Sequence, residues 1–138
     1  MLLQLLNVPN YIEHNPQAEK DIRASVNFIV SSQCYDGNFP SSMGEIKDPR
    51  KYGDELVQWC HGASGTVHLL ARAYVIWKDE KYLTALTRAA DCVWRRGLLR
   101  KGPGLCHGVS GIVRKKTKNH RKMSAEFKCE VFHSVCIP

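Results

Sequence analysis

The chain has 138 residues, of which 43% are hydrophobic and 24% charged, a composition typical of one modest globular domain. Its formal charge is +7, and residues 114–138 contribute most of it, with 7 Lys and Arg against 2 Asp and Glu, a balance of +5. No apolar run reaches the roughly 18–20 residues that a membrane span needs.

The N-terminal residues 1–6 lack the basic and apolar regions of a secretory signal. We therefore expect a reducing compartment, in which the six cysteines are thiols or metal ligands rather than disulfides.

Two helical signals flank a long turn-rich segment. Asn15 and Pro16 predict a helix over residues 16–32, because Asn is a good N-cap and Pro is tolerated at the first helical position. Residues 34–53 are rich in turn residues and predict a long loop. A structureless loop of that length is typically functional or disordered.

A helical hairpin is predicted next. Residues 65–78 are apolar on nearly all sides, which is typical of a buried helix. After a polar turn, apolar residues recur at helical spacing over residues 80–95, opposite a charged face, and Gly97 provides a stop. These patterns predict an all-α fold that pairs a buried helix with a half-exposed one.

The motif Cys-His-Gly-x-Ser-Gly occurs twice, at residues 60–65 and at residues 106–111, which are 46 residues apart. Repetition at such a period suggests a repeat architecture. Each copy sets a thiol and an imidazole beside glycines, which let the backbone turn sharply and approach a ligand closely.

Cys60, Cys106 and His107 would together make a zinc site with three protein ligands and an open fourth position. The spacing is not that of a zinc finger, so the residues alone favour a second interpretation, buried thiols in turns with histidines bonded to the backbone. His61 is interpreted as a structural histidine, or as one that contacts a metal ligand without binding the metal itself.

The two motifs, with the segments GNFPSS, ELVQWCHG, YLTALTRAADCVWRRGLL and RKGPGLCHG, resemble the LanC-like proteins, eukaryotic relatives of the bacterial lanthionine synthetase cyclases. The resemblance runs from about residue 26 to residue 111. It implies a partial α/α toroid, a fragment of a double ring of six helical hairpins. In such a ring both Cys-His-Gly turns enter inner helices at the same end, where they can meet.

The resemblance also implies a chemistry. It implies that Cys60, Cys106 and His107 bind zinc and that Lys101 contacts glutathione, where a cation can pair with a carboxylate. Zinc would then activate the glutathione thiol for addition to dehydroamino acids in peptides or proteins. Without the resemblance, the preferred interpretation of Lys101 is a solvated cation at a loop edge.

Residues 1–113 are assigned to the partial toroid and residues 114–138 to a divergent, basic, disordered tail. Six cations among residues 114–122 stand where family members carry an apolar helix. Specific nucleic-acid binding is disfavoured, because the run lacks a recognition motif and interleaved aromatic residues.

The family's acid/base residues lie in helices that this chain lacks, so no catalytic residue is assigned and an inactive chain is an open outcome. The alternatives to a thiol-adding enzyme are a non-catalytic module that binds zinc or glutathione, and a structural helical fragment. Family analogy implies a cytoplasmic location with peripheral association at the plasma membrane.

Overall fold

The computed structural model describes residues 1–51, 55–97, 102–104 and 106–107. Within these ranges the chain is helical and no strand occurs, so the predicted all-α class is confirmed. None of the described helices is long and apolar enough to cross a bilayer. The helices are α1 (Leu2–Asn7), α2 (Pro16–Ser31), α3 (Met43–Lys47), α4 (Ala63–Trp77) and α5 (Glu80–Arg96).

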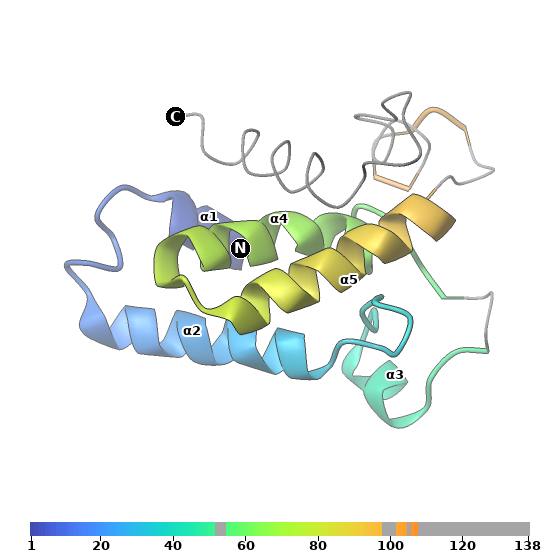
Figure 1. Cartoon of the computed structure of the whole chain (residues 1–138), viewed down its shortest axis with the longest axis horizontal. Coiled ribbons are helices and arrows are strands. Elements are labelled where there is room, and N and C mark those ends of the chain that lie inside the picture. The colour runs from blue at the N-terminus through green and yellow to red at the C-terminus, as the bar shows by residue number, and fades with distance from the viewer. Residues whose placement is uncertain (52–54, 98–101, 105, 108–138) are drawn as a thin grey trace.

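The three predicted helices correspond to α2, α4 and α5, and their ends agree within two residues. Helices α4 and α5 run in opposite directions as a hairpin, with α1 packed against α4 and α2 packed against α5 (Figure 1). The start of α4 and the end of α5 therefore lie at the same end of the hairpin. Cys60 of the first motif and Cys106 and His107 of the second flank the hairpin and are brought to that end.

Helix α4 buries more than one of its faces, whereas α5 buries a single stripe. The stripe on α5 recurs every three or four residues, which is the pattern of an amphipathic helix lying on a core. This agrees with the expected pairing of a buried inner helix and a half-exposed outer one. The buried residues are Ala63, Ser64, Val67, Leu69, Leu70, Ala71 and Ala73 of α4, and Tyr82, Ala85, Leu86, Ala89, Ala90 and Cys92 of α5.

Tyr82 joins α5 to α2 through the core. Its ring has no exposed surface, and its hydroxyl donates a hydrogen bond to Asn27 Oδ1 at 2.7 Å. A large apolar area is thus buried without leaving the hydroxyl unsatisfied. Around it pack Leu6 of α1, Ile22 and Val26 of α2, and Leu69 and Ala73 of α4.

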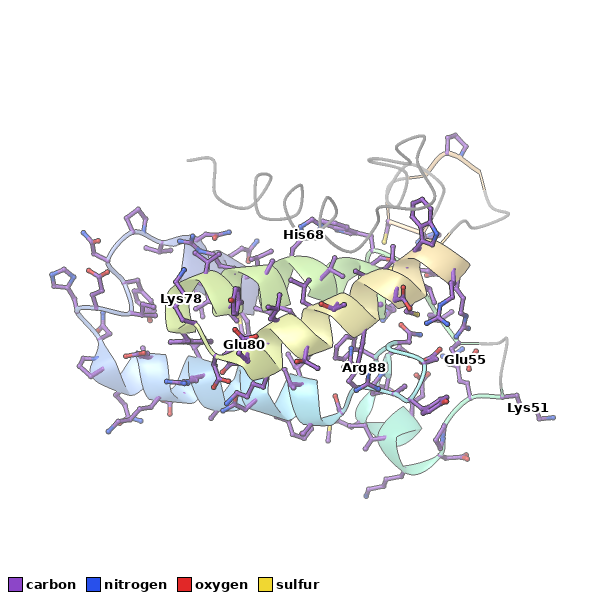
Figure 2. The ribbon with its side chains drawn as sticks, in the orientation of Figure 1. Lys51, Glu55, His68, Lys78, Glu80 and Arg88 are labelled. Carbon is purple, nitrogen blue, oxygen red and sulfur yellow. The ribbon has the colours of Figure 1, made fainter. Side chains whose placement is uncertain are left out.

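The turn between α4 and α5 is short. Lys78 ends α4 in the left-handed conformation, with φ of 51°. Asp79 then caps α5, because its side chain accepts a hydrogen bond from the backbone N–H of Lys81 at 3.2 Å. Figure 2 shows Lys78 and Glu80 on either side of this turn.

The segment at residues 34–53 differs from the expectation of a structureless loop. It contains α3, whose first turn is capped by Ser42 through a bond from the backbone N–H of Glu45. The Glu45 carboxylate accepts bonds from the backbone and hydroxyl of Ser41, both at 2.7 Å. Local side-chain bonds of this kind organise a short helix without any apolar periodicity.

Two features near the N-terminus also differ from the prediction. Helix α1 was not predicted, because six residues are too few to show a helical period. Asn15 does precede α2, but its side-chain amide donates to the carbonyl of Tyr11 at 2.9 Å and makes no capping bond.

Leu70→Ala should lower the free energy of unfolding by about 2–5 kcal/mol, because Leu70 has no exposed surface and its truncation leaves a cavity. Thr84→Ala, on the exposed face of α5, is the control and should change it by less than about 0.5 kcal/mol. Urea unfolding followed by far-UV circular dichroism measures both. Equal effects would contradict the assignment of α4 as the buried inner helix.

Candidate metal centre

The first Cys-His-Gly motif begins with a tight turn. The backbone N–H of Gln58 donates to the carbonyl of His61 at 2.7 Å, and the N–H of His61 donates to the carbonyl of Gln58 at 3.2 Å. This reciprocal pair places Trp59 and Cys60 at the tip of the turn. The Sγ atom of Cys60 lies 3.7 Å from Oε1 of Gln58, which is a buried residue.

The two glycines of this motif let the turn pack directly on the start of α4. Gly62 has a φ of +93°, and a Cβ atom there would overlap the carbonyl oxygen of Leu56. A Cβ atom at Gly65 would overlap the carbonyl oxygen of Trp59. Any larger residue at either position would push the turn away from the helix.

Asn38 holds both sides of this turn. Its side chain is only 2% exposed; Nδ2 donates to the carbonyl of Leu56 at 3.1 Å, and Oδ1 accepts from the backbone N–H of Ala63 at 2.8 Å. These partners lie on either side of Cys60 in the sequence. One buried amide therefore fixes the entry and the exit of the turn, and it also satisfies an N–H group at the start of α4.

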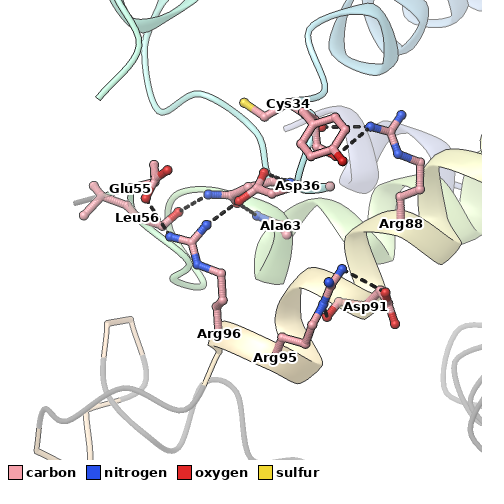
Figure 3. A network of polar contacts seen from close by, with 12 residues as sticks. Cys34, Asp36, Glu55, Leu56, Ala63, Arg88, Asp91, Arg95 and Arg96 are labelled. Atoms are coloured by element: carbon pink, nitrogen blue, oxygen red, sulfur yellow. Dashed lines mark hydrogen bonds and ion pairs between the residues drawn. The ribbon is translucent and has the colours of Figure 1, made fainter. Parts of the chain in front are cut away.

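Two arginines of α5 hold the loops that carry Asn38 and Leu56 (Figure 3). Arg96 forms ion pairs with Asp36 and with Glu55, the latter at 2.7 Å. Arg88 donates to the backbone carbonyl of Cys34 at 2.9 Å. Partial burial, the largest single effect, acts to lower the pKa of Arg96, but the hydrogen bond to Glu55 and the charges of Glu55 and Asp36 together outweigh it, so the pKa is raised. Arg96 therefore stays charged and keeps both carboxylates in place.

The Trp59 ring fixes the turn to α4 from outside. It meets the ring of His68 edge-on, with centroids 5.0 Å apart, and it remains 42% exposed. Figure 2 shows His68 on α4. This aromatic contact adds a further anchor beside Cys60.

The structure brings together the three residues predicted as metal ligands. The Sγ atoms of Cys60 and Cys106 and a ring nitrogen of His107 all lie within 4.8 Å of one another, and all three residues are exposed. The backbone N–H of Cys60 also donates to the carbonyl of Cys106 at 3.4 Å. Two turns 46 residues apart in the sequence therefore meet at one point.

The donor set fits zinc. Zinc bonds of 2.0–2.3 Å place the atoms around a tetrahedral ion roughly 3.3–3.8 Å apart, so ligand atoms that lie within 4.8 Å need to approach by no more than about 1.5 Å. Two sulfur ligands and one imidazole leave a fourth position, and exposure of all three residues opens it to solvent.

The two thiols already influence each other. The hydrogen bond with Cys60 raises the pKa of the Cys106 thiol, and partial desolvation adds to the shift. A bound cation would reverse that effect, because it stabilises the thiolate form.

The other described cysteines have different surroundings. Burial raises the pKa of the Cys92 thiol to about 11, and the Asp36 carboxylate adds to the shift. The pKa of Cys34 is also raised, by burial and then by Asp36. His61 is exposed and, within the described ranges, is not among the residues whose ligand atoms converge.

Several predictions fall outside the described residues. Lys101, the predicted glutathione contact, lies there, as do residues 108–111 of the second motif and the tail at residues 114–138. The domain boundary at residue 113 and the glutathione contact therefore stay predictions. Asn38 and Arg96, in contrast, were not predicted, although the long loop around Asn38 was expected to be functional or disordered.

The sequence matches the family described as lanthionine synthetase C-like protein over residues 1–126. It is also 34% identical over 90 residues to a Danio rerio protein named Glutathione S-transferase LANCL1. That alignment covers 65% of this chain and 21% of the relative, so the chain spans about a fifth of the curated relative it matches.

Asn38→Ala should lower the free energy of unfolding by about 1–3 kcal/mol, because it leaves the Leu56 carbonyl and the Ala63 N–H unsatisfied. Asn7→Ala makes the same truncation at an exposed site and serves as the control. Urea unfolding measures both changes. An effect at Asn38 no larger than that at Asn7 would show that the amide does not hold the turn.

Proposed function

Because this chain belongs to the lanthionine synthetase C-like family, we propose that its Cys60, Cys106 and His107 bind zinc and activate the glutathione thiol for addition to dehydroamino acids. The observation that carries the proposal is the convergence of the three ligand atoms within 4.8 Å. The name of the Danio rerio relative, Glutathione S-transferase LANCL1, supports glutathione as the thiol.

Each of the three residues has a defined part in this proposal. Cys60 and Cys106 bind as thiolates and His107 as a neutral imidazole, so the fourth position is left for the incoming thiol. When bound, zinc supplies the positive charge that lowers the pKa of a thiol in that position. Lys101 is proposed to pair with a carboxylate of glutathione and so orient it.

The reaction itself is an addition across a carbon–carbon double bond. The glutathione sulfur forms a bond to the β-carbon of the dehydroamino acid, and the π electrons move toward the carbonyl. A proton delivered to the α-carbon completes the product, so no electrons are gained or lost. Glutathione and peptides or proteins that contain dehydroamino acids are the partners we propose, and the cytoplasmic location with peripheral membrane association stays a prediction.

The exposure of all three ligands favours a second candidate, a module that binds zinc or glutathione without turnover. Water that reaches the centre weakens electrostatic control of a thiolate. Protonation of the α-carbon also requires a positioned acid, which typically contributes about 10²–10⁴-fold to a rate. The alignment covers only 21% of the relative, so thiol addition by this chain is proposed and does not follow from the similarity alone.

Cys60→Ser, Cys106→Ser and His107→Ala should each weaken zinc binding by more than about tenfold, because each removes a ligand from a three-ligand set. Competition with a chromophoric chelator measures the affinity, and the sulfur-to-metal absorption of the cobalt-substituted chain reports the ligands. Cys34→Ser removes an exposed thiol away from the cluster and is the control. Wild-type affinity in all three ligand variants would overturn the site.

At equal zinc occupancy, this chain should add glutathione to a dehydroalanine peptide at least about 100-fold more slowly than the full-length Danio rerio relative does. The reason is that exposure of all three ligands lets water reach the centre, and none of the described residues is assigned as the acid that protonates the α-carbon. Mass spectrometry of the peptide adduct gives both rates. Comparable rates would show that an open centre is sufficient for glutathione addition, and they would reject the alternative of a module that binds without turnover.

A further inference from the structure

We propose that Cys60 and Cys106 form a reversible disulfide in the zinc-free chain, so that oxidation of this pair dismantles the metal centre. The loss of the metal centre on oxidation depends on the proposed zinc site, but the disulfide itself is inferred from three observations. The two Sγ atoms lie within 4.8 Å, the backbone N–H of Cys60 lies 3.4 Å from the carbonyl oxygen of Cys106, and both residues are exposed.

The geometry needs little rearrangement. A disulfide bond has a length of about 2.05 Å, so the two sulfur atoms must approach by no more than roughly 2.8 Å. Rotation of two short, exposed side chains can supply much of that approach. The backbone hydrogen bond between the two turns already holds the main chains side by side, so the turns need not travel to meet.

The remaining described thiols are less suited to oxidation. Cys92 is 1% exposed within the core between α4 and α5, so an oxidant cannot reach its sulfur without opening the hairpin. Cys34 is exposed, but it lies in the loop after α2 and is not among the residues whose sulfur atoms converge. The pair at residues 60 and 106 therefore combines access with proximity.

The oxidant we assign is a small disulfide such as oxidised glutathione. The thiolate of one cysteine attacks a sulfur of oxidised glutathione, which forms a mixed disulfide and releases one glutathione. The thiolate of the second cysteine then attacks the mixed disulfide and releases the second glutathione. Two electrons pass from the cysteine pair to the small disulfide, and the two thiol protons leave with the two glutathione molecules.

This bond would control the proposed centre. A disulfide sulfur is no longer a thiolate ligand, so the oxidised chain keeps only His107 of the three proposed ligands. Reduced glutathione reverses the exchange and restores the pair. In a reducing compartment, a disulfide of this kind would be transient and would report the state of the thiol pool.

The test uses the full chain with Cys129→Ser and Cys136→Ser, which removes the two tail thiols from the exchange. The zinc-free protein is incubated with excess oxidised glutathione, the chain is then denatured so that remaining thiols, including the buried Cys92, can be alkylated, and the intact mass and the digest are analysed. We expect loss of two hydrogens from the mass, a cross-link between the peptides that contain Cys60 and Cys106, and alkylation at Cys34 and Cys92. Zinc binding should be lost and should return after treatment with dithiothreitol.

A further substitution makes the test specific. In Cys60→Ser, Cys106 has no partner and should retain one glutathione as a stable mixed disulfide. The absence of the 60–106 cross-link in the parent chain, or a dominant cross-link to Cys34, would overturn the inference. A 60–106 cross-link in a chain that binds no zinc when reduced would overturn the proposed function and still support the disulfide.

Discussion

The geometry around Cys60 depends on one buried amide. Asn38 donates to Leu56 and accepts from Ala63, so it ties together the two residues that bracket the turn. An amide is one of the few side chains that can donate and accept at the same time without carrying charge. Its burial makes the arrangement specific, because any displacement of the turn would leave polar groups unsatisfied away from water.

The hairpin formed by α4 and α5 provides the rigid part of this arrangement. Helix α4 presents the free N–H that Asn38 binds, and α5 presents Arg88 and Arg96, which hold the loop containing Asn38. The polar network therefore connects the loop that contains Asn38 to both helices of the hairpin (Figure 3). Ligands carried on a turn need such support if their atoms are to converge closely enough to bind one ion.

The existence of α4 and α5 could be read from the sequence, because apolar residues occupy nearly all sides of α4 and recur at helical spacing along α5. The same reasoning could not find α3, which is five residues long and depends on side-chain bonds within one turn. The pairing of an inner and an outer helix could be predicted because α4 is apolar on nearly all sides, whereas α5 is apolar on one side only.

The candidate site was predictable in part. The repeated motif and its family resemblance identified Cys60, Cys106 and His107, although spacing alone favoured neither a metal nor a contact between them. Asn38 could not be found in this way, because its partners lie 18 and 25 residues away and no period links a loop amide to distant backbone groups. The same holds for Arg96, whose charged partners come from two separate loops.

The meeting of the two turns also affects chain entropy. Helices α4 and α5 lie entirely between Cys60 and Cys106, so any bond that joins these residues, through an ion or directly, closes a loop around the whole hairpin. For a separation of 46 residues, the chain-entropy relation for a cross-link gives a stabilisation of about 4 kcal/mol at room temperature, through restriction of the unfolded chain. A bond at the centre would then stabilise the hairpin that positions the centre, so that zinc occupancy and folding are thermodynamically linked.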